Sequence, residues 1–361
     1  MNVLSLFDGI SCCRVALDRC GIQVANYYAS EIDENAITVS KRNYPTIKRL
    51  GCVKTVKSAD LPRIDIMVFG SPCQDLSRAK NDRKGLAGDR SGLFWTAAKI
   101  LKEVKPTFFI MENVASMKDT DRDAISKELG VQPVMFDASL VSAQSRKRYF
   151  WTNIPFKLPA DKGILLKNIL LPADKVADKL WVNKTFVVKK SGATSGLTRV
   201  GHVGETDAQA NRVYSIDGKS AGLVANAGGL GGKTGLYEIY IPDGDSKADI
   251  RVGHDTRRRL NADGVRVDDD KTVTPTRRVE LRNDDKCGTL TTVLKDNQIV
   301  NIPEKRIRKL DPIECERLQG LPDGYTDGIA TTNRYKALGN AFNVDVITHI
   351  LRETINFTVT F

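Results

Sequence analysis

Apolar runs and helical patterns alternate through the first 155 residues, and this alternation constrains the fold more than any other feature of the chain. Apolar runs predict buried strands at residues 2–7, 24–30, 64–70, 107–114 and 148–154. The stretches between them predict helices at residues 13–20, 33–44, 91–104 and 119–130. Asp33 and Ser91 are the expected N-caps of the second and third helices. Such alternation predicts an α/β fold, a mostly parallel sheet with helices on both faces.

The chain changes character after about residue 180, where Gly, Thr, Asn and Asp become frequent and helical periodicity disappears. Residues 213–226 and 279–293 form a faint repeat, a strand followed by a polar turn that contains lysine. Helical patterns return only at residues 311–322 and 343–355. We therefore expect one domain over residues 1–180, completed by 331–361, and a smaller, irregular β-rich domain over residues 181–330.

Charge and cysteine content narrow the classes of protein. The chain has 55 Lys and Arg against 44 Asp and Glu, and a net charge of +11 favours a polyanionic partner. The arginine run at residues 257–259 fits such a partner, with a merely solvated surface as an equal alternative. No apolar run approaches about 18 residues, so no membrane span is expected, and the N-terminus lacks the pattern of a secretory signal. The 7 cysteines include no CxxC pair, so we expect neither a metal site nor a disulfide framework.

A glycine-rich stretch, GGLGGKTG at residues 228–235, raises a rival function. It resembles a phosphate-binding loop, which would indicate an ATPase. The pattern GxxxxGK[ST] requires a glycine where Ala227 stands, and no helical pattern follows the stretch. The sequence therefore disfavours this alternative.

A cysteine directly follows a proline at the end of a predicted strand, in GSPCQDLS at residues 70–77. A lone cysteine of this kind is more often a buried structural residue than a reactive one. Its companions reverse that balance. Glu112 follows an apolar run, where an unpaired carboxylate is costly, and Arg146 and Arg148 alternate so that they face one side of a strand. Because sites in such sheets lie at the carboxyl ends of the strands, we predict that Cys73, Glu112, Arg146 and Arg148 form a catalytic group.

A second group of residues suits an adenosine-type ligand. A glycine-containing turn, LFDGIS, follows the first predicted strand, and Glu31 in SEID follows the second. The turn would let a ligand approach the backbone, and the acid would accept hydrogen bonds from ribose hydroxyls. The turn lacks the GxGxxG pattern, so no pyrophosphate cradle is predicted.

Taken together, ordered segments of the chain resemble a known family. They are LSLFDGIS, GSPCQDLS, ENV, QSRKR, RIRKLDPIECERLQGLP and YKALGNAFNVDVI. Their order and wording are similar to those of cytosine-C5 DNA methyltransferases that depend on S-adenosylmethionine, closest to the de novo type and to related viral and bacterial enzymes. The resemblance implies a Rossmann-like methyltransferase fold, with a target-recognition domain over residues 181–330.

The resemblance also implies roles for the catalytic group. The thiolate of Cys73 would add to C6 of a flipped-out cytosine, and Glu112 would bond N3 and the exocyclic amine of the base. Arg148 would hold the O2 oxygen, and Arg146 would help to position the thiol and the base. The polar loop at residues 74–92 would close over the base.

For the cofactor, the resemblance implies a larger set of contacts. The residues are Phe7, Asp8, Gly9, Ile10, Glu31, Ile32, Pro72, Leu93, Asn340 and Ala341. Two positions depart from the family pattern. Ser11 stands where a second glycine is usual, as it does in the de novo type, and Cys52 stands where an aspartate usually receives the adenine amine. A backbone carbonyl could take over that contact.

The implied partner is double-stranded DNA, bound by a monomer without a metal or a membrane. The implied location is the cytoplasm, as the interior of a prokaryotic or virus-infected cell, or the nucleus of a eukaryote. Two alternatives use the same motifs: a tRNA cytosine-C5 methyltransferase and a catalytically inactive, DNA-binding homologue. The recognised base sequence cannot be read from these motifs, because direct readout depends on a few individually placed side chains.

Overall fold

The computed structural model describes most of the chain, in two compact units. The described residues are 1–72, 76, 85–88, 91–184, 186–194, 196–225, 228–240, 249–259, 271–272, 274, 276–281, 298–302 and 305–358. The larger unit comprises Met1–Glu238 and Ile307–Phe361, and the smaller comprises Ile239–Arg306. Cys73 and most of the predicted lid loop lie outside the described residues.

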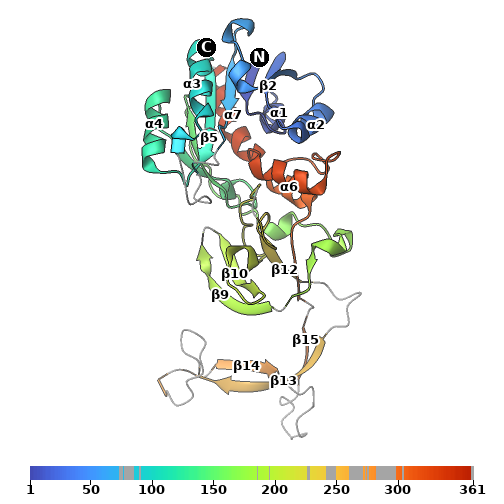
Figure 1. The fold of residues 1–361 in the computed structure, drawn as a ribbon. Coiled ribbons are helices and arrows are strands. Elements are labelled where there is room, and N and C mark those ends of the chain that lie inside the picture. The colour runs from blue at the N-terminus through green and yellow to red at the C-terminus, as the bar shows by residue number, and fades with distance from the viewer. Residues whose placement is uncertain are drawn as a thin grey trace. The chain divides into compact units, whose positions relative to one another are not determined.

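A seven-stranded sheet forms the centre of the larger unit (Figure 1). Its strands are β1 (Asn2–Leu6), β2 (Asn26–Ser30), β3 (Lys48–Gly51), β4 (Ile66–Phe69), β5 (Phe108–Val114), β6 (Val134–Asp137) and β7 (Lys147–Thr152). Their order is β3-β2-β1-β4-β5-β7-β6. The first five run parallel, and β7 pairs antiparallel with both of its neighbours. The prediction of a mostly parallel sheet is confirmed.

Seven α-helices accompany this sheet in the described part of the larger unit. They are α1 (Cys12–Arg19), α2 (Glu34–Asn43), α3 (Leu93–Val104), α4 (Asp119–Leu129), α5 (Pro312–Leu318), α6 (Thr331–Asn340) and α7 (Val344–Thr358). Short 3-10 turns lie at Val53–Thr55, Ser58–Asp60, Gly85–Ala87, Ala138–Leu140, Leu166–Asn168, Ala173–Lys175, Asp178–Leu180 and Gln209–Asn211. Asp33 caps α2 as predicted, since its carboxylate accepts from the N–H groups of Asn35 and Ala36.

The predicted cap of α3 is wrong. Gly92, not Ser91, precedes the helix, and no side chain caps it. The hydroxyl of Ser91 instead donates to the carbonyl oxygen of Pro72 at 3.0 Å. A serine hydroxyl can bond only a few groups at once, and here it ties the start of α3 to the turn after β4.

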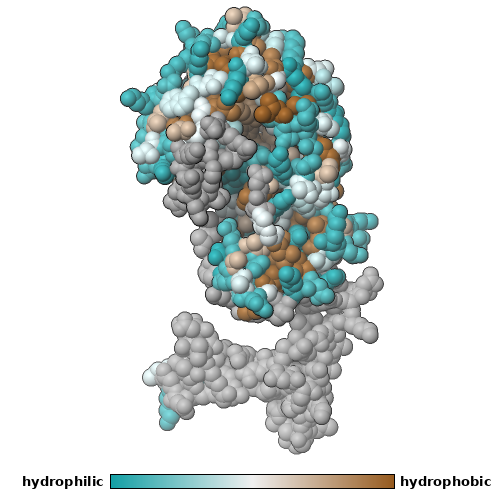
Figure 2. All heavy atoms as spheres, viewed as in Figure 1, coloured by the Kyte–Doolittle hydropathy of each residue, from teal (hydrophilic) through white to brown (hydrophobic). Residues whose placement is uncertain are grey.

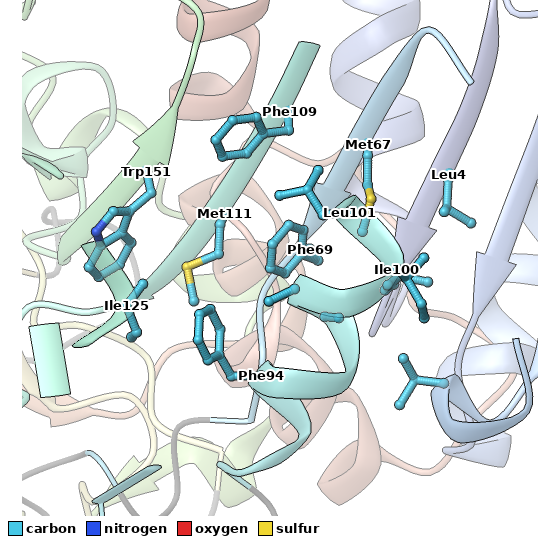
Figure 3. Close-up of a cluster of buried hydrophobic side chains, with 14 of the residues drawn as sticks. Leu4, Met67, Phe69, Phe94, Ile100, Leu101, Phe109, Met111, Ile125 and Trp151 are labelled. Atoms are coloured by element: carbon cyan, nitrogen blue, oxygen red, sulfur yellow. The ribbon is translucent and has the colours of Figure 1, made fainter. Parts of the chain in front are cut away.

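The main core lies between one face of the sheet and helices α3 and α4 (Figure 3). Leu4, Phe69 and Met111 belong to three adjacent strands; Met111 lies beside Phe94 of α3, and Leu4 lies nearer Ile100 of the same helix. Burial of each such side chain contributes about 1.5–3 kcal/mol. Side chains that alternate with them are also buried, among them Val3, Ile66, Val68 and Ile110. Neighbouring residues of a strand point to opposite faces, so burial of both sets shows that both faces of the sheet are covered. Helices α1 and α7 pack against each other. Helices on both faces are thus confirmed.

The region after residue 180 is rich in β-strands, as predicted. A six-stranded sheet has the order β8-β16-β12-β11-β10-β9. Its strands are β8 (Trp181–Val182), β9 (Phe186–Thr194), β10 (Leu197–Val203), β11 (Arg212–Ser215), β12 (Leu236–Tyr240) and β16 (Lys305–Arg308). A three-stranded antiparallel sheet comprises β13 (Asp249–Arg258), β14 (Thr276–Leu281) and β15 (Gln298–Ile302).

Contacts group residues up to Glu238 with the large sheet, so the division into compact units falls later than residue 181. These contacts do not test the predicted functional division, which stays a prediction. The second copy of the faint repeat lies mostly outside the described residues. Among the described helices, none combines the length and the apolar character needed to cross a membrane. On the face shown in Figure 2, hydrophilic residues predominate and hydrophobic ones are interspersed, as is usual for a protein surface.

Candidate active site

A cavity of about 790 Å³ lies in the larger unit, at the carboxyl ends of β1, β2, β4 and β5. Every predicted site residue other than Cys73 lines it. These residues are Phe7, Asp8, Gly9, Ile10, Glu31, Ile32, Pro72, Leu93, Glu112, Arg146, Arg148, Asn340 and Ala341. Cys73 lies outside the described residues, although its neighbour Pro72 contributes to the wall. The structure therefore brings the two predicted groups, which are far apart in sequence, into one place.

The turn after β1 has an unusual backbone. Phe7, Gly9 and Ser11 have φ values of 56°, 58° and 62°, in the left-handed region that favours glycine. The Asp8 carboxylate stabilises this turn, because it accepts from the hydroxyls of Ser11 at 2.5 Å and Tyr27 at 2.7 Å. Burial raises the pKa of Asp8, against the opposing effect of these hydrogen bonds. The carboxylate of Asp8 is thus bonded within the turn, and the turn itself lines the cavity.

Glu31 joins the turn after β2 to the turn after β1. One of its carboxylate oxygens accepts from the N–H of Gly9 at 2.8 Å. The other accepts from the N–H groups of Ile32 at 2.8 Å and Asp33 at 2.9 Å. The side chain of Ile32, which follows, is 68% exposed while lining the cavity, so it offers an apolar surface to a bound molecule.

Glu112 and Arg148 form an ion pair across neighbouring antiparallel strands. Nε of Arg148 lies 2.7 Å from Oε1 of Glu112, and the two side chains are only 20% and 13% exposed. Val114 of β5 is paired in register with Arg148 of β7, which places the guanidinium near the end of the strand that carries the glutamate. The pair presents a carboxylate and a guanidinium side by side, a combination that can both donate to and accept from a planar polar ring.

Arg146 acts in the structure as a link between backbone segments. Its guanidinium donates to the carbonyl oxygens of Leu223 at 3.2 Å, Gly339 at 3.1 Å and Ala341 at 3.0 Å. The residue is 6% exposed. Charge-assisted hydrogen bonds of this kind are stronger than neutral ones, so Arg146 fixes the C-terminal wall of the cavity against β7.

The turn that leads to Cys73 is held from two sides. The side-chain amide of Asn113 donates to the carbonyl oxygen of Ser71 at 3.2 Å and to its hydroxyl at 3.1 Å. The hydroxyl of Ser91 bonds the carbonyl oxygen of Pro72. The backbone immediately before the cysteine is therefore anchored to β5 and to the start of α3.

The sequence missed several residues that line the cavity. Asn333 and Lys336 belong to α6, a helix that the sequence did not predict. Lys336 donates to the carboxylate of Asp33 at 2.6 Å, and Asn333 donates to Asn35 at 2.9 Å, so α6 and the start of α2 are joined at the cavity. Burial acts to raise the pKa of Asp33. The bonds from Lys336 and from helix N–H groups outweigh burial, so the pKa of Asp33 is lowered.

Other unpredicted members of the wall come from turns and strand ends. They are Cys12, Ser30, Asn35, Ala36, Val53, Gly70, Ser71, Val114, Ala337, Gly339 and Phe342, together with Asp33. Cys52, singled out as a departure from the family pattern, also lines the cavity. In the part of the chain that the structure describes, no three His, Cys, Asp or Glu side chains gather in a way that could hold a metal ion.

Comparison with known proteins gives the family. The model of the C-5 cytosine-specific DNA methylase family matches residues 1–356, and the chain belongs to this family. The type II methyltransferase M.HhaI of Haemophilus parahaemolyticus is 25% identical over 382 residues, covering 99% of this chain and 96% of that protein. The orphan methyltransferase M.SPRI of Bacillus phage SPR is 27% identical over 433 residues, covering 99% and 98%.

Solved structures with a similar fold include the Entamoeba histolytica methyltransferase EhMeth. Its TM-score is 0.63 at 14% identity, covering 99% of this chain and 98% of that one. A mutant of Spodoptera frugiperda DNMT2 gives a TM-score of 0.59 at 18% identity, covering 98% and 99%. At these identities the likeness concerns the fold alone.

The predicted family, fold class and enzyme class are confirmed. The protein is a DNA (cytosine-5-)-methyltransferase, a member of a family that uses S-adenosylmethionine. The roles of individual site residues stay predictions, because neither a family match nor a fold match assigns them.

Proposed function

We propose that this enzyme transfers a methyl group from S-adenosylmethionine to C5 of a flipped-out cytosine in a specific short sequence of duplex DNA, through a covalent bond between Cys73 and C6. The observation that carries the proposal is the single cavity that contains both the Glu112–Arg148 pair and the turns around Glu31. Pro72, directly before Cys73, lines the same cavity.

The cavity fits the cofactor. Its volume of about 790 Å³ is within the usual range for small-molecule sites, which combine apolar walls with a few polar groups. Phe7, Ile32 and Leu93 supply apolar wall, and Glu31 supplies the polar group. The residues that would hold S-adenosylmethionine are Phe7, Asp8, Gly9, Ile10, Glu31, Ile32, Pro72, Leu93, Asn340 and Ala341, with Asp8 contributing backbone because its carboxylate is already bonded. When bound, the cofactor supplies an activated methyl group.

The chain's own residues solve the chemical problem that C5 of cytosine is a poor nucleophile. The thiolate of Cys73 forms a bond to C6, and the electron pair of the C5–C6 double bond is then available at C5. Glu112, held by Arg148, bonds N3 and the exocyclic amine, so that N3 can carry a proton while the ring is no longer aromatic. After methylation, loss of the C5 proton restores the double bond and expels the thiolate of Cys73.

Access to the base requires that it leave the duplex, which costs about a few kcal/mol. A free cysteine is only a few per cent thiolate near neutral pH, and nearby guanidinium groups increase that fraction. We propose that residues 181–330 read the DNA sequence, that the enzyme acts as a monomer, and that it works inside the cell. The relatives described above come from a bacterium and a phage, which supports this location.

A methyl-transfer assay on duplex DNA and on tRNA tests the proposal. We expect transfer to duplex DNA alone, and bisulfite sequencing of DNA from an expressing host should show one methylated sequence. Transfer to tRNA alone would support the RNA alternative, and no transfer with intact cofactor binding would support an inactive homologue. The family model and the names of the relatives reported above favour neither alternative.

A further inference from the structure

Gly70, the residue that follows β4, has no room for a side chain. A Cβ atom built there would lie 2.7 Å from Cε1 and 2.9 Å from Cζ of Phe342, and 3.4 Å from Oε2 of Glu112. The φ angle of Gly70 lies outside the left-handed region, so its backbone conformation is open to other residues. The ring of Phe342, rather than the backbone, therefore explains why a glycine is needed here.

The backbone around Phe342 is fixed on both sides. Before it, the guanidinium of Arg146 bonds the carbonyl oxygens of Gly339 and Ala341. After it, the side-chain amide of Asn343 donates to the carbonyl oxygen of Leu318 at 2.9 Å. These buried hydrogen bonds are costly to leave unmade, so they hold the backbone at Phe342 in place. The ring can therefore yield to a group at Gly70 only by turning about its own side-chain torsions.

Phe342 also lies between two parts of the site. It lines the large cavity, and it lines a neighbouring cavity of about 10 Å³ whose other members include Glu112, Arg148 and Phe150. The same ring thus contacts the turn that leads to Cys73 and borders the space behind the glutamate–arginine pair.

We propose that Phe342 is a positioning residue for the reaction. Its ring packs against Gly70 and supports the Gly70–Pro72 turn, which precedes Cys73, beside the carboxylate of Glu112. This inference rests on the proposed function, in which those two groups act on the same base. Real Cβ atoms essentially never approach other atoms closer than 3.0 Å, so a methyl group at Gly70 must displace the turn, the ring or both. Displacement of reacting groups by about 1 Å can cost about a hundredfold in rate.

Compensating substitutions test the inference. Gly70→Ala should slow single-turnover methyl transfer by about a hundredfold. Phe342→Leu keeps an apolar side chain but removes the ring atoms that support the turn at Gly70, so it should alone slow transfer by about tenfold. In the double variant the added methyl has space, so its rate should return to within about threefold of Phe342→Leu.

Phe109→Leu provides the matched control. Phe109 is a buried phenylalanine on β5 that belongs to the core beside α3 and does not line the large cavity. Combined with Gly70→Ala it loosens the same sheet without making space at Gly70, and this pair should remain as slow as Gly70→Ala alone. If Gly70→Ala fails to fold, the inference predicts that Phe342→Leu restores folding and Phe109→Leu does not.

A second measurement separates positioning from cofactor binding. Calorimetry should give S-adenosylmethionine affinities within about threefold of wild type in the Phe342→Leu and double variants, whereas adduct formation with 5-fluorocytosine DNA should follow the transfer rates. Undiminished activity in either Gly70→Ala or Phe342→Leu, failure of Phe342→Leu to rescue Gly70→Ala, or rescue by both phenylalanine variants would overturn the inference. Wild-type enzyme that methylates no duplex DNA would instead overturn the proposed function.

Discussion

The cavity of the larger unit and the three-stranded sheet of the smaller unit differ in how their charged residues are arranged. At the cavity, charged side chains have defined partners, as in the ion pair of Glu112 with Arg148 and that of Asp33 with Lys336. In the smaller unit, the strand register places Arg257 of β13 opposite Arg277 of β14. Two basic residues thus occupy facing positions of this sheet.

This difference fits two kinds of substrate contact. Paired charges hold their side chains in one geometry, which suits chemistry on a single base. A strand pair with arginine at facing positions concentrates positive charge, which favours a polyanion such as DNA. We therefore expect substitutions at the cavity to change rate at nearly constant DNA affinity, and substitutions in β13 to change affinity at nearly constant rate.

The largest effect should come from Cys73→Ser. Methyl transfer should fall below detection because a serine hydroxyl is far less nucleophilic than a thiolate, while affinity for S-adenosylmethionine stays close to that of wild type. DNA with 5-fluorocytosine at the target should trap a covalent adduct with wild-type enzyme, since fluorine at C5 cannot leave as a proton does. An active enzyme that gives no adduct on denaturing gels would contradict the role of Cys73.

Glu112→Gln should produce the next largest loss, about a hundredfold or more in the single-turnover rate. A neutral amide cannot support a protonated ring nitrogen as a carboxylate does, and it also loses the charge that holds Arg148. Glu128→Gln is the control, because Glu128 forms only a surface pair with Lys102, for which about 0–1 kcal/mol is typical. Equal effects of the two substitutions would show that Glu112 has no special part in the reaction.

Much of the fold of the larger unit could be predicted from sequence, because its strands and most of its helices have clear periodic patterns. The exceptions have physical causes. β3 has only partly buried or exposed residues, so it lacks an apolar run. α6 buries only Leu338 and Gly339, so it shows no apolar stripe. Missing α6 meant missing Asn333 and Lys336, which line the cavity from that helix.

The candidate site was predictable where it depends on residue type at strand ends. Glu31 and Glu112 stand out in sequence because carboxylates follow apolar runs. Contacts that depend on close approach could not be predicted. Neither of the sequences GSPC and NAFN indicates that the ring of Phe342 fills the space next to Gly70. The link from Arg146 to Gly339 and Ala341 likewise requires the folded chain, because it joins segments almost 200 residues apart.

Neutralising the arginine run tests the other side of the comparison. Replacing Arg257, Arg258 and Arg259 by Gln should weaken binding to target and non-target duplexes by similar factors, because phosphate contacts carry no sequence information. The slope of log affinity against log salt should become shallower by about one unit for each lost contact. The methylated sequence should stay the same.

The control for this variant removes the same charge elsewhere. Lys99, Lys102 and Lys105 lie on α3 or at its C-terminal end and are exposed, at the end of the helix away from Leu93 and the cavity. Their replacement by Gln should leave the salt slope unchanged. Methylation of new sites by the arginine variant, at unchanged salt dependence, would mean that the run reads bases rather than phosphates.

The smallest effect concerns Asp8, whose charge at the cavity is balanced by hydroxyl groups rather than by a cation. Burial raises the pKa of Asp8 above its unfolded value, so the native state holds this proton to higher pH than the unfolded state. The free energy of unfolding therefore loses a contribution as pH rises from about 4 through the raised pKa of Asp8. In Asp8→Asn this loss is absent, because the amide does not titrate, while its oxygen can still accept from Tyr27. Urea unfolding of both proteins between about pH 4 and pH 7 should show the difference in stability shifting toward the variant as pH rises. A difference that is independent of pH would mean that the hydroxyls of Ser11 and Tyr27 compensate the buried charge as fully as water does.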